Sequence, residues 1–368
     1  MQCSTFRACV TVRAEDISSL PLVLYRRTAD GRERADYMPL YGILHDEPNS
    51  EMSAMQLREL WEQHICLYGN TYSVIQRNRS GDVIALWPLH PDSVKTKRKN
   101  KTGPVEYEWT RSELPPKTFN AKDILHIRAQ VDETGITGRS AVDDAREAIG
   151  LALAIERFSA MFFSNGATFS GDFELPTSLG DVAFERLKKE LLETHQGPSN
   201  QWKPLILEGG MKYTPRSATP EQSQMVELAE FTAIQIMRYL RVQPAIVQDH
   251  KRSSFSNVTE QVVSHVKFCL RPETIRIEQE INRKLLSPED RKLYYPEHLF
   301  EGLLRGDQKT RGDWYALMLQ NGVLSINEVR RLENLLPVEG GDEHQTQVNM
   351  AGVADPPTDE EGQDDENV

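Results

Sequence analysis

The chain has 368 residues, a length that allows two or three modules. Hydrophobic residues make up 39% and charged residues 27%, a composition typical of a folded protein. Its net charge is −12, but ten acidic residues and no Lys or Arg lie between Glu339 and Val368, so the preceding part carries only −2. A nearly neutral body excludes a protein that condenses onto nucleic acid through bulk positive charge.

The first third of the chain predicts a mixture of strands and one clear helix. Ser53 is placed to cap an amphipathic helix, and Gly69 is placed to end it because glycine adopts the left-handed conformation at no steric cost. Runs rich in β-branched and aromatic residues predict strands between turn residues. These strands cover Leu20–Arg26, Thr71–Arg77, Val83–Trp87, Val105–Trp109 and Asp123–Arg128.

The middle of the chain predicts two long helices around a small insert. Hydrophobic periodicity indicates one helix over Val142–Asn165 and a second that Thr219 and Pro220 begin. The insert between them favours a strand, a helix and a strand. These three elements cover Phe173–Leu175, Asp181–His195 and Lys203–Leu207.

A polar loop, Gln248–Asn257, precedes a third long helical stretch, Val258–Leu286. Pro272 interrupts that stretch, and we expect a kink near Arg271, with two separate helices as the alternative, because proline removes one helical hydrogen bond and clashes with the preceding turn. Beyond Pro337 the acidic sequence loses its periodicity and is predicted to be disordered. Two shorter helices are expected near Gln308–Gln320 and Asn327–Leu335.

No motif predicts catalysis, a metal or a cofactor. Gly135–Ser140 lacks the spacing and the lysine of a phosphate-binding loop, and the four scattered cysteines form no zinc-binding pair. His64 and His265 lie in helical patterns, where a structural role is favoured. The basic run Lys95–Lys101 favours a solvated turn, with contact to nucleic acid or an acidic partner as the alternative. No apolar stretch reaches the roughly 20 residues that a bilayer requires.

The order of the elements is the strongest signal and predicts an α+β fold. Long helices with wide apolar faces need neighbours to cover them, and identical subunits packed side by side would supply that cover. When such head-to-tail contacts close, they form a ring.

The sequence also resembles the portal proteins of long-tailed double-stranded DNA phages, over nearly its whole length up to about Asp342. The order and spacing of several short runs carry the resemblance, rather than any single run. The matching runs are Leu20-Pro21-Leu22, Glu47-Pro48-Asn49, Tyr68-Gly69-Asn70-Thr71-Tyr72, Trp87-Pro88-Leu89-His90-Pro91, Asp123-Ile124-Leu125-His126-Ile127, Gly138-Arg139-Ser140, Phe163-Ser164-Asn165-Gly166, Val242-Gln243-Pro244, Ser325-Ile326-Asn327-Glu328-Val329-Arg330, Pro337 and Gly340-Gly341-Asp342.

The resemblance implies a ring, usually of twelve subunits, at one capsid vertex, assembled in the host bacterial cytoplasm. Double-stranded DNA passes through this ring without its sequence being recognised. The implied partners are other copies of the chain, the DNA, the terminase motor, the major capsid protein and the head–tail connector or adaptor proteins. Its implied parts are a wing (1–138), stem helices (139–165 and 220–243) around a clip (166–219), a channel loop (244–257), a kinked helix with the remaining wing or crown (258–336) and an acidic tail (337–368).

The resemblance also assigns candidate site residues. The implied channel loop contains the candidates Asp249, His250, Lys251, Arg252, Ser253 and Phe255. Of these, we expect Lys251, Arg252 and Phe255 to line the constriction. In the implied clip, Lys188, Lys189 and Trp202 are candidates for contact with the motor, although packing against the insert's own helix is the alternative for the tryptophan.

Two other classes of protein stay open at this stage. One is a nucleic-acid-processing enzyme that uses the basic Lys95–Lys101 hairpin, which predicts a monomer or dimer with metal- or nucleotide-dependent turnover. The other is a different ring-forming phage protein, such as a neck adaptor, which would lack the order of long helix, insert and long helix.

Overall fold

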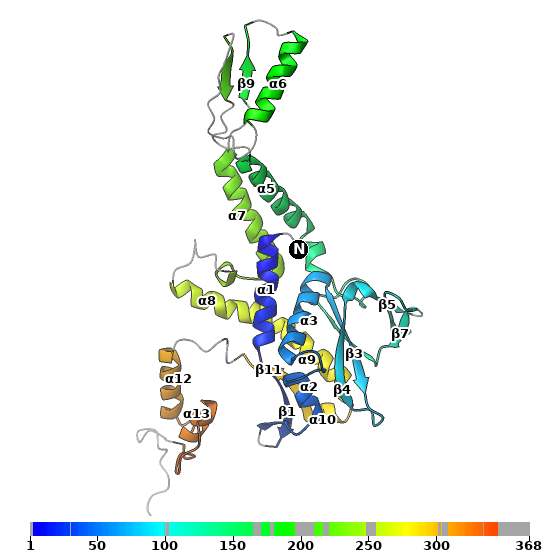
Figure 1. The fold of residues 1–368 in the computed structure, drawn as a ribbon. Helices are drawn as coiled ribbons and strands as arrows, with labels where there is room; N and C mark the ends of the chain where they lie inside the picture. Colours follow the sequence, from blue (N-terminus) through cyan, green and yellow to red (C-terminus); the bar gives the residue numbers. More distant parts are fainter. Residues whose placement is uncertain are drawn as a thin grey trace, which may run out of the picture. The chain divides into compact units, whose positions relative to one another are not determined.

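The computed structural model describes residues 3–29, 31–98, 100, 103–164, 171–176, 180–195, 210–215, 221–247, 255–300, 303, 308–333 and 335–344. The chain divides into two compact units, Met1–Leu299 and Phe300–Val368. Figure 1 shows their elements in chain order.

The larger unit mixes helices and strands, in agreement with the predicted α+β class (Figure 1). Its helices are α1 (Ser4–Ser19), α2 (Pro39–His45), α3 (Ala54–Tyr68), α4 (Ala141–Asp144), α5 (Arg146–Ser164), α6 (Asp181–His195), α7 (Glu221–Leu240), α8 (Phe255–His265), α9 (Arg271–Leu285) and α10 (Asp290–Leu293), with the short turns η1 (Pro91–Ser93), η3 (Pro244–Val247) and the π-helical η4 (Val266–Leu270).

Its described strands form four antiparallel sheets, in the orders β11-β1-β2, β4-β3-β8, β5-β6-β7 and β10-β9. The strands are β1 (Leu22–Thr28), β2 (Gly31–Arg34), β3 (Asn70–Arg77), β4 (Val83–Leu89), β5 (Val94–Arg98), β6 (Val105–Trp109), β7 (Lys117–Asn120), β8 (Ile124–Arg128), β9 (Gly171–Glu174), β10 (Lys212–Pro215) and β11 (Tyr294–His298). All five strands expected in the first third of the chain are therefore confirmed within a few residues.

The sheet β4-β3-β8 lies between α3 and the sheet β5-β6-β7. Successive strand residues point to opposite faces, so Ser73 faces α3 and Tyr72 faces the sheet β5-β6-β7. On the α3 side, Trp61 Nε1 donates a hydrogen bond to Ser73 Oγ over 2.9 Å. On the other side, Tyr72 packs in a buried cluster with Tyr107 and Phe119.

Helix α3 begins and ends where its sequence predicts. The Ser53 hydroxyl accepts a hydrogen bond from the Gln56 backbone, and the Gln56 side chain accepts one from the Ser53 backbone, which is a complete capping box. Gly69 ends the helix in the left-handed conformation, with φ of 71°.

Helix α1 was not predicted. Its buried face includes Phe6, Val10 and Ile17, but the same face carries Arg13, so the apolar period is broken in the sequence. The helix packs against α3 and α7.

The long helices are confirmed with corrected boundaries. The helix expected over Val142–Asn165 is divided at Ala145 into α4 and α5. Helix α7 lies beside α5, and the two run in opposite directions as a hairpin, hereafter the stem hairpin (Figure 1). In the insert, α6 has the predicted bounds, β10 was not predicted, and the strand expected at Lys203–Leu207 lies outside the described residues.

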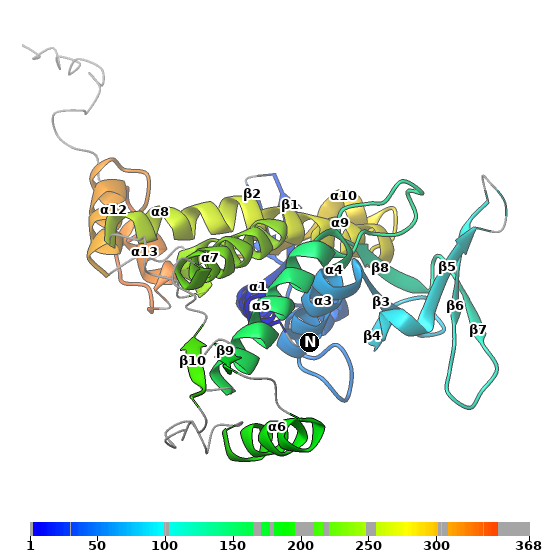
Figure 2. The ribbon, with the colours of Figure 1, turned by 90° about the horizontal axis from the view of Figure 1, so that it is seen from above.

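The interruption expected near Arg271 takes the form of a π-helical turn. The Arg271 N–H donates to the Val266 carbonyl, five residues back, and the wider turn accommodates Pro272 without a broken helix. Helices α8 and α9 consequently follow one another as one extended run (Figure 2).

The smaller unit contains α12 (Gln308–Gln320) and α13 (Ile326–Leu332), close to the two predicted short helices. Ser325 and Glu328 form a second capping box. The prediction of disorder after Pro337 is wrong for the segment that follows at once, because Asn327 exchanges side-chain hydrogen bonds with the Val338 backbone, and its N–H donates to Gly341. Residues 345–368 lie outside the described residues.

Candidate functional site

The stem hairpin exposes apolar side chains along both of its helices. On α5, Glu147, Leu151, Ala154, Phe158 and Met161 follow one another at intervals of four, three, four and three residues, which places them on one face. We call this face the α5 edge. All five side chains are exposed, Phe158 by 43% and Met161 by 59%.

The corresponding face of α7 has the same spacing. It consists of Gln224, Leu228, Phe231, Gln235 and Arg238, and we call it the α7 edge. Phe231 is 50% exposed, whereas Thr232 and Ile236, on the other face of the helix, are fully buried. Large apolar side chains aligned on the outside of a helix indicate a contact surface for another molecule.

The base of α4 and α5 is held by a close crossing of two backbones. Gly69 at the end of α3 meets Gly138 in the loop after β8, and the Ala129 N–H donates to the Gly69 carbonyl. A Cβ at Gly69 would lie 2.4 Å from the Arg139 carbonyl carbon, and one at Gly138 would lie 2.1 Å from the Gly69 oxygen. Both positions therefore require glycine. We call this crossing the glycine anchor.

Asn70 and Ser140 secure the glycine anchor. The Asn70 side chain accepts a hydrogen bond from the Gly138 N–H over 2.7 Å and donates one to the Gly138 carbonyl over 3.0 Å. Ser140 caps α4 through its hydroxyl, which also donates to the Leu67 carbonyl of α3 over 2.6 Å. One serine thus fixes where the first stem helix begins relative to α3.

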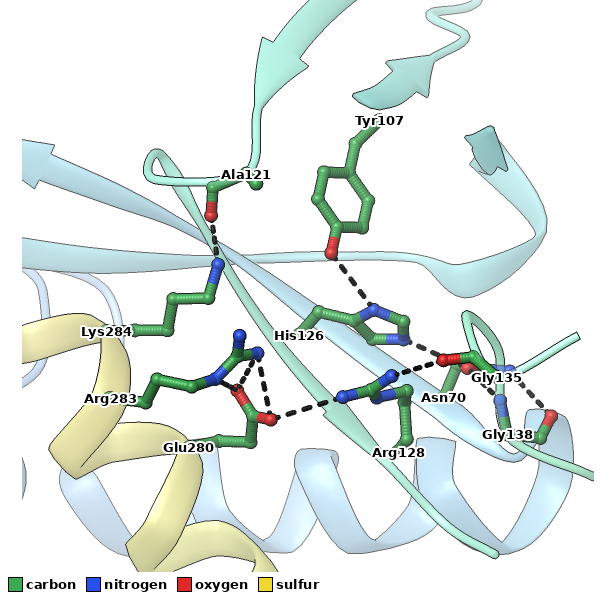
Figure 3. A network of polar contacts seen from close by, with 10 residues as sticks. All are labelled: Asn70, Tyr107, Ala121, His126, Arg128, Gly135, Gly138, Glu280, Arg283 and Lys284. Atoms are coloured by element: carbon green, nitrogen blue, oxygen red, sulfur yellow. Dashed lines mark hydrogen bonds and ion pairs between the residues drawn. The ribbon is translucent and has the colours of Figure 1, made fainter. Parts of the chain in front are cut away.

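A buried histidine orients that asparagine (Figure 3). His126 Nε2 donates to Asn70 Oδ1 over 2.9 Å, and its Nδ1 accepts from the Tyr107 hydroxyl at 3.2 Å. Burial, assisted by the positive charge of Arg128, holds the pKa of His126 well below its usual range. The ring is therefore neutral at physiological pH and acts as a fixed donor and acceptor.

The same view shows how α9 is tied to the loop after β8 (Figure 3). Arg128 donates to the Gly135 carbonyl over 3.0 Å and lies 3.4 Å from the carboxylate of Glu280 on α9, which also pairs with Arg283. The Lys284 ammonium donates to the Ala121 carbonyl. These contacts join the helix to the sheet that carries His126.

The end of α7 is held by a second network, which we call the charge anchor. Arg13 of α1 donates to the Leu240 carbonyl at the end of α7 over 3.1 Å. Its guanidinium also lies 2.6 Å from Glu62 of α3 and 3.6 Å from Glu273 of α9. All three charged side chains are buried. A single arginine therefore connects four helices.

Burial of the Glu62 and Glu273 carboxylates has an electrostatic cost, although Arg276 also lies 2.6 Å from Glu273. Desolvation, opposed by Arg13 and assisted by the charge of Glu273, raises the pKa of Glu62 to about 7. The Cys66 thiol donates to the Glu62 carboxylate over 3.2 Å, and burial raises the pKa of that thiol well above its usual range. Cys66 and the other three cysteines are buried free thiols.

The predicted site residues are only partly described. Asp249, His250, Lys251, Arg252 and Ser253 lie outside the described residues, and so does Trp202. Phe255 was expected in the loop, but it is the first residue of α8, so the helix begins three residues earlier than predicted.

The two lysines of the implied clip lie on α6. Both are exposed, and Lys188 Nζ lies 3.8 Å from Glu185 one turn away. Whether this surface contacts a motor stays a prediction.

The basic run that supported an enzyme lies largely on β5. Lys97 pairs with Glu108 of β6 over 2.5 Å, and Lys95 stands opposite the same glutamate in the ladder. The described part of this strand pair therefore presents a mixed surface rather than a cationic one. Among the residues that the structure describes, no group of His, Cys, Asp and Glu is arranged to hold a metal ion, and no helix is long and apolar enough to cross a membrane.

Comparisons with solved structures agree with this architecture. The neck of an empty GTA particle, computed with C6 symmetry, contains a chain that matches with a TM-score of 0.64 at 23% identity, over 90% of both chains. An HK97-family phage portal protein from Corynebacterium diphtheriae matches with a TM-score of 0.61 at 12% identity, over 83% of this chain and 95% of that one. The fold is that of the matching phage portal protein structure.

Sequence comparison gives the family. Residues 4–334 match the model of the family described as phage portal protein. The portal protein of Enterobacteria phage HK97 is 31% identical over 98% of this chain and 85% of its own length. The chain belongs to the phage portal protein family.

The glycine anchor accounts for the position of some of the matching sequence runs. Three of them, Tyr68–Tyr72, Asp123–Ile127 and Gly138–Ser140, are far apart in the sequence but meet at the glycine anchor. Sequence reasoning recognised these runs without a role for them. It did not recognise Arg13, because a lone arginine in a weakly periodic segment gives no signal of a structural role.

Proposed function

We propose that copies of this chain form the ring-shaped channel at one capsid vertex through which DNA is packaged and ejected. The observation that carries the proposal is the stem hairpin, which exposes large apolar side chains on each of its helices and has a base fixed by two buried networks. A unit with two such edges has room for a neighbour on each side, which is what a closed ring requires.

The charge of the chain suits a conduit. A duplex must slide, and each lysine–phosphate contact adds to a salt-dependent affinity that would hold it in place. Without its acidic terminus the chain carries a net charge of only −2. Family membership and the symmetric neck particle among the solved structures support the same reading.

The implied parts can be assigned to the described elements. In this proposal α4, α5 and α7 are the stem, the segment with β9, α6 and β10 is the clip, and the sheets with α3 and α9 belong to the wing. The clip would dock the terminase, and the ring would also meet the major capsid protein and the head–tail connector proteins.

Imaging of the purified full chain tests the proposal. We expect annular particles with a central hole on an electron microscopy grid, and a mass of many chains by light scattering. Chains that stay single at every protein and salt concentration would contradict it.

Two further experiments address the parts. Replacement of Lys251, Arg252 and Phe255 together by Ala in an infectious phage should impair packaging or DNA retention, and unchanged packaging and retention would remove the loop from the channel. Reversal of the charges of Lys188 and Lys189 should weaken capture of terminase by the ring, and undiminished capture would exclude them as motor contacts.

A further inference from the structure

The two edges of the stem hairpin end in opposite charges at its base. Glu147 begins the α5 edge, and Arg238 ends the α7 edge. The nearby acids already have partners, because Asp144 pairs with Arg139 and Asp143 pairs with Arg146. Within the described ranges of the chain, neither Glu147 nor Arg238 has an ion-pair partner.

These two charges lie at the same level of the hairpin. Glu147 lies 17 residues before Ser164, where α5 ends, and Arg238 lies 17 residues after Glu221, where α7 begins. At 1.5 Å per residue, each is about 25 Å from the end of the hairpin that leads to the insert. Rotation about an axis along the hairpin preserves this level, so it brings Glu147 of one copy to the height of Arg238 of the next.

Arg238 borders a groove that is large enough for a helical turn. The groove has a volume of about 670 Å³ and lies between the end of α7, η3 and the π-helical turn. Its floor is apolar, and Phe268 in it is 56% exposed. Its lining includes Ile234, Met237, Val242, Phe268, Arg238 and Arg241.

Arg241 occupies a backbone position that normally favours glycine. Its φ is 57°, which makes it the only non-glycine residue with a positive φ among the described residues. It follows α7 in a Schellman motif, in which the Val242 N–H donates to Met237 and the Arg241 N–H donates to Arg238. An arginine that bears this backbone strain, and that has no ion-pair partner among the residues described, indicates a role for its side chain outside the fold.

We propose that this groove receives the base of α5 from a second copy of the chain, with Glu147 between Arg238 and Arg241 and Leu151 on the apolar floor. Glu147 and Leu151 are one helical turn apart and both exposed, so a single turn presents the carboxylate and the apolar group together. The proposal rests on the proposed ring and names a contact that would hold each subunit against the next. Two features favour this occupant. The negative charge of Glu147 complements the two arginines of the groove, and Glu147 lies at the same height along the hairpin as Arg238.

Charge reversal in the full chain tests the contact. The variants are Glu147→Arg, the pair Arg238→Glu and Arg241→Glu, and the combination of all three. We expect each of the first two to raise the protein concentration of half-assembly by about 10-fold or more, because like charges then face each other. The combined variant restores opposite charges and should return to within about 3-fold of the unmodified chain. Light scattering at fixed salt measures all four proteins.

Arg79→Glu is the matched control, since Arg79 is an exposed arginine in the turn between β3 and β4. It should assemble as the unmodified chain does. If rings form but neither reversal weakens them, or if the combined variant assembles no better than the single ones, the contact is wrong while the proposed ring stands. An unmodified chain that never assembles would overturn both.

Discussion

The base and the edges of the stem hairpin distribute polarity in opposite ways. The base buries charged groups, such as Arg13 and Glu62, whereas the edges expose large apolar groups, such as Phe158 and Phe231. A helix of an isolated globular protein normally has its polar residues outside and its apolar residues inside. One chain therefore completes the base by itself, whereas the edges leave exposed apolar groups that a second chain would cover in the proposed ring.

The largest effect is expected from removal of the arginine at the centre of the charge anchor. Arg13→Met leaves the Glu62 and Glu273 carboxylates buried without it and removes the donor to Leu240, so the unassembled chain should lose about 3–5 kcal/mol of unfolding free energy. Urea denaturation measures the loss. The control is Arg26→Met, which breaks an exposed pair with Glu33 and should cost far less, because water screens exposed ion pairs. Equal losses would contradict the distinction between base and surface.

The glycine anchor should be the next most sensitive point. Gly69→Ala introduces a Cβ that meets the Arg139 backbone, and we expect a loss of about 3 kcal/mol or more. Gly135→Ala is a matched control, because Gly135 has nearly the same φ, 72° against 71°, with no atom within 4 Å of the added Cβ. It should cost only about 1 kcal/mol, from backbone strain alone. Similar losses in both variants would mean that the close crossing does not hold the stem.

The charge anchor should also make stability depend on pH. The pKa of Glu62 rises from 4.5 to about 7 on folding, so between these values the folded chain binds more protons than the unfolded one. Unfolding free energy should therefore fall by about 2 kcal/mol as the pH rises from 5 to 7. Glu62→Gln, which stays neutral beside Arg13, Glu273 and Cys66, should remove most of this slope. A slope that the substitution leaves unchanged would assign it to other groups.

The smallest effect separates folding from assembly. Arg241→Gly relieves a left-handed backbone, so the unassembled chain should gain about 0.5–1 kcal/mol in stability, while its ring should form less readily because a guanidinium of the groove is lost. Arg241→Lys, which keeps the charge, should assemble more like the unmodified chain. A glycine variant that is more stable and assembles equally well would show that Arg241 has no role between copies.

The sequence predicts the parts of this molecule whose determinants are local. Capping residues and spacing located α3, and runs rich in β-branched and aromatic residues located β3 and β4. Helices α5 and α7 follow from their apolar period. Pro272 marked the site of the irregular turn but not its π-helical form, which depends on how α8 and α9 pack.

The candidate site was harder to predict because its residues act across long sequence separations. Asn70 and Gly138 are 68 residues apart, and only the folded chain shows that they exchange hydrogen bonds. Arg13 made α1 unrecognisable, since a charge on the buried face hides the period that would have indicated a helix. Val338 and Gly341 were expected to be disordered because the composition around them is acidic and lacks periodicity. Their order comes instead from hydrogen bonds with Asn327, which composition does not indicate.

The central claim is that the α5 edge of one copy meets the α7 edge of the next. Cysteine cross-linking tests this claim most directly. Ala154 on the α5 edge and Phe231 on the α7 edge each lie 10 residues from the end of the hairpin that leads to the insert. A chain with both Ala154→Cys and Phe231→Cys should give a ladder of dimers, trimers and larger species under mild oxidation, because its own four cysteines are buried. Either substitution alone should give no ladder. A double variant that remains a single band would contradict the account.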